Sequence, residues 1–346
     1  MKLVVIIPAL NEEATIAEVI QRIPSAFEAG LDEVEVIVVD DGSSDRTGQA
    51  AEQVGASVVR HHRNRGVGAA FQTGISAALD SRADLIVNMD ADGQFRPEDI
   101  PTLIQPLLEN RADMVTCTRF ALPDYQPEMP RIKRWGNKMM CRLVNNICQG
   151  TSFTDVSCGF RAYTRKTAVR LTLFGQFTYT QESFIDLVGK GVQIVEVPLR
   201  VRGQREVGKS RVASNLWNYA KRTSLIILCA ARDTRPLAFF GTAGLLVTLF
   251  GVLCGMIVFG IWLATGKTSY VRSLLIGSGA FLVLGFLLYV FAMIADMLGR
   301  QRQLVEEVLV TLRTQDRQLD EKTRERIGRQ LSGSAAEEEF EHAEDG

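Results

Sequence analysis

Two long apolar runs, residues 237–264 and 274–298, constrain the fold of this 346-residue chain more than any other feature. Each run is longer than the roughly 20 residues that a helix needs to cross a bilayer. The link of residues 265–272 is too short for a folded domain, so the runs predict a transmembrane hairpin with both outer ends on one side. Gly251 and Gly255 form a G-x-x-x-G spacing, which can pack the hairpin or join subunits of a homo-oligomer.

Basic residues indicate the side on which the ends of the hairpin lie. They concentrate before the first run and just after the second, at Arg300 and Arg302, whereas the link has only Lys267 and Arg272. By the positive-inside rule we expect both termini in the cytoplasm. The strand-like run 3–7 is too short for a signal peptide, so the first half of the chain is also expected in the cytosol.

The charges of the chain nearly cancel overall but not locally. Removing the six acidic residues at the C-terminus from the net charge of −1 leaves +5, much of it between 200 and 235. A basic cluster beside an apolar run indicates an anionic membrane surface, and the chain lacks the sustained basic character of a nucleic-acid-binding protein. We therefore expect an amphipathic juxtamembrane helix at 212–235, the hairpin at 236–299, a cytoplasmic helix at 300–331 and a disordered acidic tail at 332–346.

The six cysteines are expected to be reduced, packed thiols. None forms a C-x-x-C pair and only three histidines are present, so a structural zinc site is not expected. The cysteines are Cys117, Cys141, Cys148, Cys158, Cys229 and Cys254.

Strand-like runs alternate with helical patterns through the first two hundred residues. This alternation predicts an α/β domain whose mainly parallel sheet has helices on both faces. The expected strands are 3–7, 34–40, 56–60, 85–89, 114–118 and 192–197, and the expected helices are 12–28, 45–54, 67–80, 98–109 and 130–148. Ligands of such sheets bind at the carboxyl ends of the strands, where the polar motifs of this chain fall.

Asp90 and Asp92 follow a short apolar strand, and they give the clearest indication of a functional site in the chain. On extended backbone, side chains at i and i+2 point the same way. Two carboxylates so paired suit a hard divalent cation whose remaining ligands are phosphate oxygens. Gly93 permits a tight turn after the pair, and Gln94 can add a neutral oxygen ligand.

Other polar residues are expected at the same edge of the sheet. Asp41 can bind a ribose hydroxyl or a base N–H, and Arg119 can contact a phosphate. The string from Arg63 to Ala70 lacks the third glycine of a dinucleotide fingerprint and follows the third strand, so a dinucleotide site is not expected. A dense group of cations after the last strand needs phosphates or lipid headgroups to offset its repulsion; it comprises Arg200, Arg202, Arg205, Lys209 and Arg211.

Six strings within residues 3–211 resemble, in order, the family-2 inverting glycosyltransferases of the GT-A fold, and among them the dolichyl- or polyprenyl-phosphate sugar synthases. The strings are P-A-L-N-E-E, V-V-D-D-G-S-S-D, N-R-G-V-G-A-A, M-D-A-D-G-Q, D-V-S-C-G-F-R and R-E-V-G-K-S-R. The resemblance implies a GT-A domain over 1–211. Leu10 replaces a frequent Tyr, Arg211 a usual Lys and Cys158 a frequent Ser, so base contacts at Leu10 and hydrogen-bond geometry at Arg211 are expected to differ.

The resemblance also implies roles for particular residues. The catalytic residues would be Asp90, Asp92 and Arg119, with Mg²⁺ or Mn²⁺ held by Asp90, Asp92 and Gln94. The acceptor phosphate would meet Arg119, Arg134, Arg202 and Lys209. The nucleotide sugar would be bound by Pro8, Leu10, Glu12, Val39, Asp41, Asp90, Ala91, Asp92, Gln94, Arg119, Arg205 and Arg211.

The implied reaction is transfer of a hexose from GDP-mannose or UDP-glucose to a polyprenyl or dolichyl phosphate at the cytoplasmic face of the bilayer. A lipid phosphate is largely ionised at neutral pH and needs little help from a base, so Asp155 or Glu182 could instead orient the sugar or an arginine. A processive polysaccharide synthase is one alternative, but its Q-x-x-R-W signature is absent, since residues 131–135 read R-I-K-R-W. An inactive membrane scaffold is another, although it would have no use for the paired carboxylates.

Overall fold

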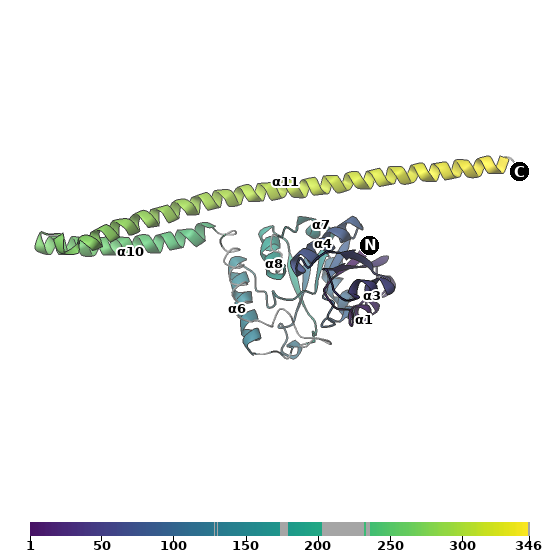
Figure 1. Cartoon of the computed structure of the whole chain (residues 1–346), viewed down its shortest axis with the longest axis horizontal. Helices are drawn as coiled ribbons and strands as arrows, with labels where there is room; N and C mark the ends of the chain where they lie inside the picture. Colours follow the sequence, from purple (N-terminus) through teal and green to yellow (C-terminus); the bar gives the residue numbers. More distant parts are fainter. Residues whose placement is uncertain (128, 130, 174–178, 203–231, 233–235, 345–346) are drawn as a thin grey trace.

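The computed structural model describes residues 1–127, 129, 131–173, 179–202, 232 and 236–344. It comprises an α/β domain and two long C-terminal helices, of which the first leads away from one side of the domain and the second returns past the domain (Figure 1). The juxtamembrane helix expected at 212–235 lies outside the described residues, apart from Arg232, as do Arg205, Lys209 and Arg211.

A seven-stranded sheet forms the centre of the domain, in the order β3-β2-β1-β4-β6-β5-β7. All pairs are parallel except those of β6, which runs antiparallel to both β4 and β5. The predicted mainly parallel α/β sheet is therefore confirmed. The strands are β1 (Lys2–Ala9), β2 (Glu33–Asp40), β3 (Ser57–Arg60), β4 (Leu85–Asn88), β5 (Met114–Thr118), β6 (Arg161–Thr164) and β7 (Ile194–Pro198).

Helices cover both faces of the sheet because alternate side chains of its central strands point in opposite directions. Leu3 and Val5 of β1 pack in the same apolar cluster as residues of α1 and α5, whereas Val4 and Ile6 pack with residues of α4, α7 and α8. Strands apolar on both faces are expected for a sheet buried between two layers of helices. The helices are α1 (Ile16–Gln21), α2 (Ala26–Ala29), α3 (Thr47–Gln53), α4 (Val67–Asp80), α5 (Ile100–Leu108), α6 (Arg131–Ile147), α7 (Arg165–Arg170) and α8 (Thr180–Gly189), with 3-10 turns η1 (Pro97–Asp99) and η2 (Pro123–Tyr125).

In the part of the domain that the structure describes, one strand and two α-helices were not expected from the sequence, and one expected helix is broken. The helix expected at 12–28 is two short helices, because Pro24 lies between them and has no N–H to continue a helix. The additional elements are β6, α7 and α8. The antiparallel direction of β6 matters for function, because its first residue lies at the edge where the parallel strands end. The segment from Asp155 to Phe160 is thereby brought to that edge.

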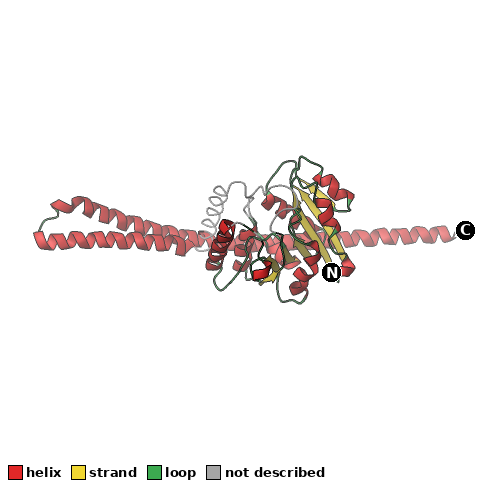
Figure 2. Cartoon of the chain, turned by 90° about the horizontal axis from the view of Figure 1, so that it is seen from below, coloured by secondary structure: helices red, strands yellow, loops and turns green. Residues whose placement is uncertain are grey.

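The two C-terminal helices form the predicted hairpin. Helix α10 (Pro236–Thr265) and the first part of α11, Arg272–Gln301, are long and apolar enough to cross a membrane, and the 3-10 turn η3 (Ser269–Val271) joins them (Figure 2). Ser278 Oγ of α11 donates a hydrogen bond to the carbonyl of Gly251 (2.9 Å), and a Cβ on Gly255 would lie 3.0 Å from the same Oγ. The G-x-x-x-G spacing therefore packs the hairpin, and a homo-oligomer stays a prediction.

Helix α11 differs from the expectation beyond the hairpin. It runs without a break from Arg272 to Glu344, where the sequence predicted a separate helix at 300–331 and a disordered tail at 332–346. The Ala- and Glu-rich stretch after Ser334 has high helix propensity, which favours continuation of the helix despite its charge. On its way past the domain α11 contacts α7 (Figure 1).

The five cysteines of the described residues are buried and free, as expected for reduced thiols. Cys229 lies outside the described residues.

Candidate active site

The strands β1, β2 and β4 end along one edge of the sheet, and hydrogen bonds join the loops that follow them. The N–H of Asn11 donates to Ser43 Oγ (2.9 Å), and Asn11 Oδ1 accepts the N–H of Ser44 (2.7 Å). Thr15 Oγ1 donates to the carbonyl of Ala91 (2.8 Å). These contacts bring together the loops that the sequence predicted to bind the nucleotide and the metal.

Asp90 and Asp92 lie in the turn that follows β4. Asp92 is only 4% exposed and its Oδ1 accepts the N–H of Gln94 (3.1 Å), whereas Asp90 is half-buried. Gly93 has a φ of 71°, a conformation that glycine adopts without strain. The carbonyl of Gln94 accepts the N–H of Arg202 (3.0 Å), so the segment after β7 returns to the carboxylate turn.

Gly159 and Tyr179, which are distant in the sequence, lie next to Asp90 and to Asn88 at the end of β4. Asn88 Nδ2 donates to the carbonyl of Gly159 (2.7 Å) and to Tyr179 Oη (2.8 Å). A Cβ on Gly159 would lie 3.2 Å from both carboxylate oxygens of Asp90 and 3.0 Å from Tyr179 Oη. Burial, and then the charge of Asp90, raise the pKa of Tyr179 well above its usual range, so it remains a neutral phenol.

Four of the residues predicted to bind the nucleotide lie in the β1–β2 part of the edge. Pro8 and Val39 are buried strand residues, and Leu10 and Glu12 are half-buried just beyond β1. The N–H of Glu12 donates to Thr47 Oγ1 (2.8 Å), which ties this loop to the start of α3.

Asp41 is 3% exposed and orders the loop that leads into α4. Its carboxylate accepts the N–H groups of Arg65 (2.9 Å) and Gly66 (2.8 Å), and its Oδ1 lies 2.7 Å from His61 Nδ1. The structure thus gives Asp41 a definite part in shaping the edge, and its contact with a nucleotide stays a prediction.

Arg119 is held by a buried carboxylate at the end of β5. Its Nε donates to Asp155 Oδ2 (2.6 Å) and its Nη2 to Asp155 Oδ1 (3.0 Å), while Asp155 itself is fully buried. Burial alone would lower the pKa of Arg119, but the charge and hydrogen bonds of Asp155 outweigh it and raise that pKa above its ordinary value. The guanidinium is therefore a fixed cation, and the interpretation that Asp155 orients an arginine is confirmed.

The other predicted phosphate-binding cations are only partly described. Arg134 of α6 and Arg202 are exposed. Arg205, Lys209 and Arg211 lie outside the described residues, so their approach to the site stays a prediction.

Comparison with known proteins identifies the family. The sequence profile of glycosyl transferase family 2 matches residues 4–171. An uncharacterised protein of Methanocaldococcus jannaschii is 33% identical over 199 residues, which cover 57% of this chain and 79% of that protein. The chain belongs to glycosyl transferase family 2.

Two relatives of this family 2 glycosyltransferase are polyprenyl-phosphate sugar transferases. The undecaprenyl-phosphate 4-deoxy-4-formamido-L-arabinose transferase of Edwardsiella ictaluri is 28% identical over 326 residues, covering 88% of this chain and 93% of the relative. The UDP-N-acetylglucosamine–dolichyl-phosphate N-acetylglucosaminyltransferase of Methanococcus voltae is 29% identical over 215 residues, covering 56% and 83%. The resemblance drawn from the six strings is confirmed.

The fold of the family 2 domain is also found in a solved structure. Glucosyl-3-phosphoglycerate synthase of Mycobacterium tuberculosis, in complex with Mn²⁺, UDP and phosphoglyceric acid, superposes with a TM-score of 0.52 at 24% identity, covering 66% of this chain and 78% of that one. The likeness concerns the fold, and it confirms the expected GT-A architecture.

The donor set at the end of β4 fits a divalent metal. Asp90, Asp92 and Gln94 offer carboxylate and amide oxygens, which Mg²⁺ and Mn²⁺ accept. Among the described residues no group of three or more His, Cys, Asp or Glu side chains is arranged to hold a metal. Two carboxylates would thus leave most coordination positions to the oxygens of a diphosphate and water, which suits a metal that arrives with the nucleotide.

Several residues that shape the site had no role predicted from the sequence. Asn88 and Glu196 are polar residues within apolar strands, and this pattern could have marked them. Gly159 lies inside the D-V-S-C-G-F-R string, but its contact with Asp90 depends on the antiparallel strand β6 that was not expected. The sequence around Tyr179 gives no indication of its role, because the residues that it contacts lie far away in the sequence.

Proposed function

We propose that this family 2 glycosyltransferase transfers one sugar from a nucleoside-diphosphate sugar to a polyprenyl phosphate at the cytoplasmic face of a membrane. One observation supports this most: the Asp90–Asp92 turn shares an edge of the sheet with a guanidinium fixed by Asp155, in a chain with two bilayer-length apolar helices. The carboxylates suit a divalent metal that accompanies the leaving diphosphate, and the guanidinium suits an incoming phosphate.

The donor is proposed to be a UDP-sugar. The name of the Methanococcus voltae relative includes a UDP-sugar, and the neighbouring solved structure contains UDP. GDP-mannose, the donor of a dolichyl-phosphate mannosyltransferase, is the alternative donor, and the experiment described below includes it. When bound at Asp90, Asp92 and Gln94, Mg²⁺ or Mn²⁺ would stabilise the charge that grows on the leaving diphosphate.

The acceptor is proposed to be a lipid phosphate because Asp155, the buried carboxylate beside Arg119, binds that arginine and is not available as a general base. Asp155 holds Arg119 through two hydrogen bonds, so it is poorly suited to deprotonate a neutral hydroxyl. A phosphate monoester is already ionised near pH 7. One of its oxygens would form a bond to the anomeric carbon as the bond from that carbon to the diphosphate breaks, with inversion, while Arg119 offsets the repulsion between the two phosphates.

Helix α6 supports the placement of the domain against the bilayer. Figure 1 shows α6 on the side of the domain toward the hairpin, running across the direction of α10. Its Trp135 is 63% exposed, and Lys138, Met139 and Arg142 are exposed on the same helical face. An aromatic ring and cations on one face suit the anionic surface of a membrane.

The proposal is tested by incubating the purified full-length chain with labelled UDP-sugars or GDP-mannose, undecaprenyl phosphate and Mn²⁺. We expect transfer of a single sugar to the lipid, and its loss when EDTA removes the metal. Transfer to a sugar hydroxyl, or to a growing polymer, would instead favour a polysaccharide synthase. No transfer from any donor would favour an inactive scaffold.

A further inference from the structure

Glu196 lies on the edge strand β7 and binds the backbone of the segment that precedes β6. Its Oε1 accepts the N–H groups of Thr154 and Asp155 (both 2.9 Å), and its Oε2 accepts Thr154 Oγ1 (2.9 Å). Three donors on one carboxylate fix the peptide between these two residues more firmly than a single contact would.

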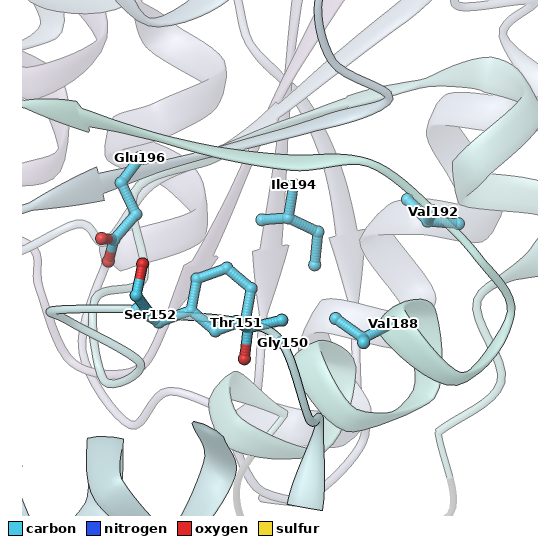
Figure 3. Close-up of a pocket in the computed structure, with 8 residues that line it drawn as sticks. Gly150, Thr151, Ser152, Val188, Val192, Ile194 and Glu196 are labelled. Atoms are coloured by element: carbon cyan, nitrogen blue, oxygen red, sulfur yellow. The ribbon is translucent and has the colours of Figure 1, made fainter. Parts of the chain in front are cut away.

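The carboxylate of Glu196 is partly buried at the end of a small cavity. Figure 3 shows its carboxylate next to Ser152, at one end of a cavity of about 330 Å³ whose other end is formed by Val188 and Val192. Burial raises the pKa of Glu196 above its usual value, and the backbone N–H groups of Asp155 and Thr154 oppose that rise. The carboxylate is thus partly removed from water and directed at the peptide.

Two paths lead from this fixed peptide to Arg119. In the first, the side chain of Asp155 accepts both hydrogen bonds of the guanidinium (2.6 and 3.0 Å). In the second, Thr154 Oγ1 lies 2.6 Å from the hydroxyl of Thr118, the residue before Arg119. Glu196 therefore restrains both the partner of the arginine and the end of its strand.

We infer that Glu196 is a positioning residue, which fixes Arg119 so that the site can bind the acceptor phosphate. The inference rests on the proposed function, in which Arg119 contacts that phosphate. A cation already held in place needs no reorganisation when the phosphate arrives, so its interaction with the phosphate is stronger than that of a mobile side chain. Glu196 itself touches neither substrate.

Glu196→Gln tests this with little change in volume. The amide places an N–H₂ group where an oxygen accepted a hydrogen bond, so the peptide loses part of its restraint. We expect the KM for undecaprenyl phosphate to rise about tenfold, the effect of losing one charge-assisted hydrogen bond, and the KM for the nucleotide sugar to change less than about twofold. Glu35→Gln is the matched control, because Glu35 is also a half-buried strand carboxylate but lies away from the site, on β2 near its start; it should leave both values unchanged.

A double-mutant cycle separates positioning from general structural support. If Glu196 acts through Arg119, then Glu196→Gln should add less than about twofold in an Arg119→Lys background, because the interaction it supports is already impaired. The same tenfold loss in both backgrounds would overturn the inference, as would equal changes in the KM for donor and acceptor.

A structure of the Glu196→Gln variant decides the matter without an activity assay. We expect the guanidinium of Arg119 to lose at least one of its two hydrogen bonds to Asp155. Retention of both would overturn the inference. If the wild-type chain transfers sugar to no lipid phosphate, the proposed function fails, and this structural comparison still tests whether Glu196 positions Arg119.

Discussion

Gly159 packs closely against the carboxylate of Asp90. A Cβ added to Gly159 would lie 3.2 Å from both carboxylate oxygens. We predict that Gly159→Ala displaces Asp90 and lowers kcat about 10- to 100-fold, because small displacements of a catalytic group have effects of this size. The concentration of Mn²⁺ needed for half-maximal rate should rise as well. Gly189→Ala is the control, because a Cβ there meets no atom within 4 Å. An unchanged metal requirement in Gly159→Ala would contradict the prediction.

The ion pair of Arg119 and Asp155 also affects stability. Arg119→Ala would leave a fully buried carboxylate without its cation, and we expect the free energy of unfolding to fall by about 3–5 kcal/mol. Denaturant unfolding of the full-length protein in detergent measures this change. Arg22→Ala, which removes a more exposed ion pair with Glu98, should cost no more than about 1 kcal/mol. An equal fall in the free energy of unfolding of the two variants would contradict a larger contribution from the buried pair of Arg119 and Asp155.

Residues whose chemistry is encoded by their neighbours in the sequence were predictable. Asp90 and Asp92 follow an apolar strand, and their spacing indicates a metal without knowledge of any contact. The partner of Arg119 was harder to assign, since Asp155 lies 36 residues away and meets it only because β6 is antiparallel. Glu196 was not assigned at all, because its partners are backbone groups of a distant loop.

At the scale of elements, strongly periodic segments were predictable and short ones were not. Helix α4 has the predicted bounds, and the strands of the parallel part differ by a few residues at most. Strand β6 has four residues, and its first, Arg161, is fully buried. A buried cation contradicts the usual pattern of a strand. Arg161 is accommodated by hydrogen bonds to the carbonyls of Cys158 and Val156 and to Ser183 Oγ, and by the rings of Phe184 and Tyr179.

The hairpin depends on close packing of its two helices at small residues. A Cβ on Gly251 would lie 3.1 Å from both the backbone nitrogen of Leu282 and the Cβ of Phe281, whereas one on Gly260 of the same helix would meet no atom within 4 Å. We therefore predict that Gly251→Val separates the helices and costs about 1–3 kcal/mol, and that Gly260→Val is neutral. Thermal unfolding in detergent compares the two variants, and equal melting temperatures would contradict the packing.

At the scale of the whole molecule, the position of α6 predicts which side of the domain touches the membrane. Trp135 should lie in the lipid interface, so in a chain whose other two tryptophans are replaced (Trp217→Phe, Trp262→Phe) brominated lipids should quench its fluorescence. Quenching should be stronger in anionic than in zwitterionic liposomes and should weaken in a Lys138→Glu/Arg142→Glu variant. Lys166→Glu, on α7, is the control. Quenching by aqueous iodide, with no effect of the brominated lipids, would contradict this orientation.

The proposed reaction requires that Asp90 and Asp92 bind a divalent metal together with a nucleoside diphosphate. The most direct measurement is a titration of the full-length protein with Mn²⁺ in the presence of UDP, followed by electron paramagnetic resonance. The wild-type chain should bind one Mn²⁺ in a UDP-dependent manner. Asp92→Asn should abolish this binding, and Asp124→Asn, which changes an exposed carboxylate of η2, should not. Undiminished, UDP-dependent Mn²⁺ binding by the Asp92→Asn variant would contradict the account.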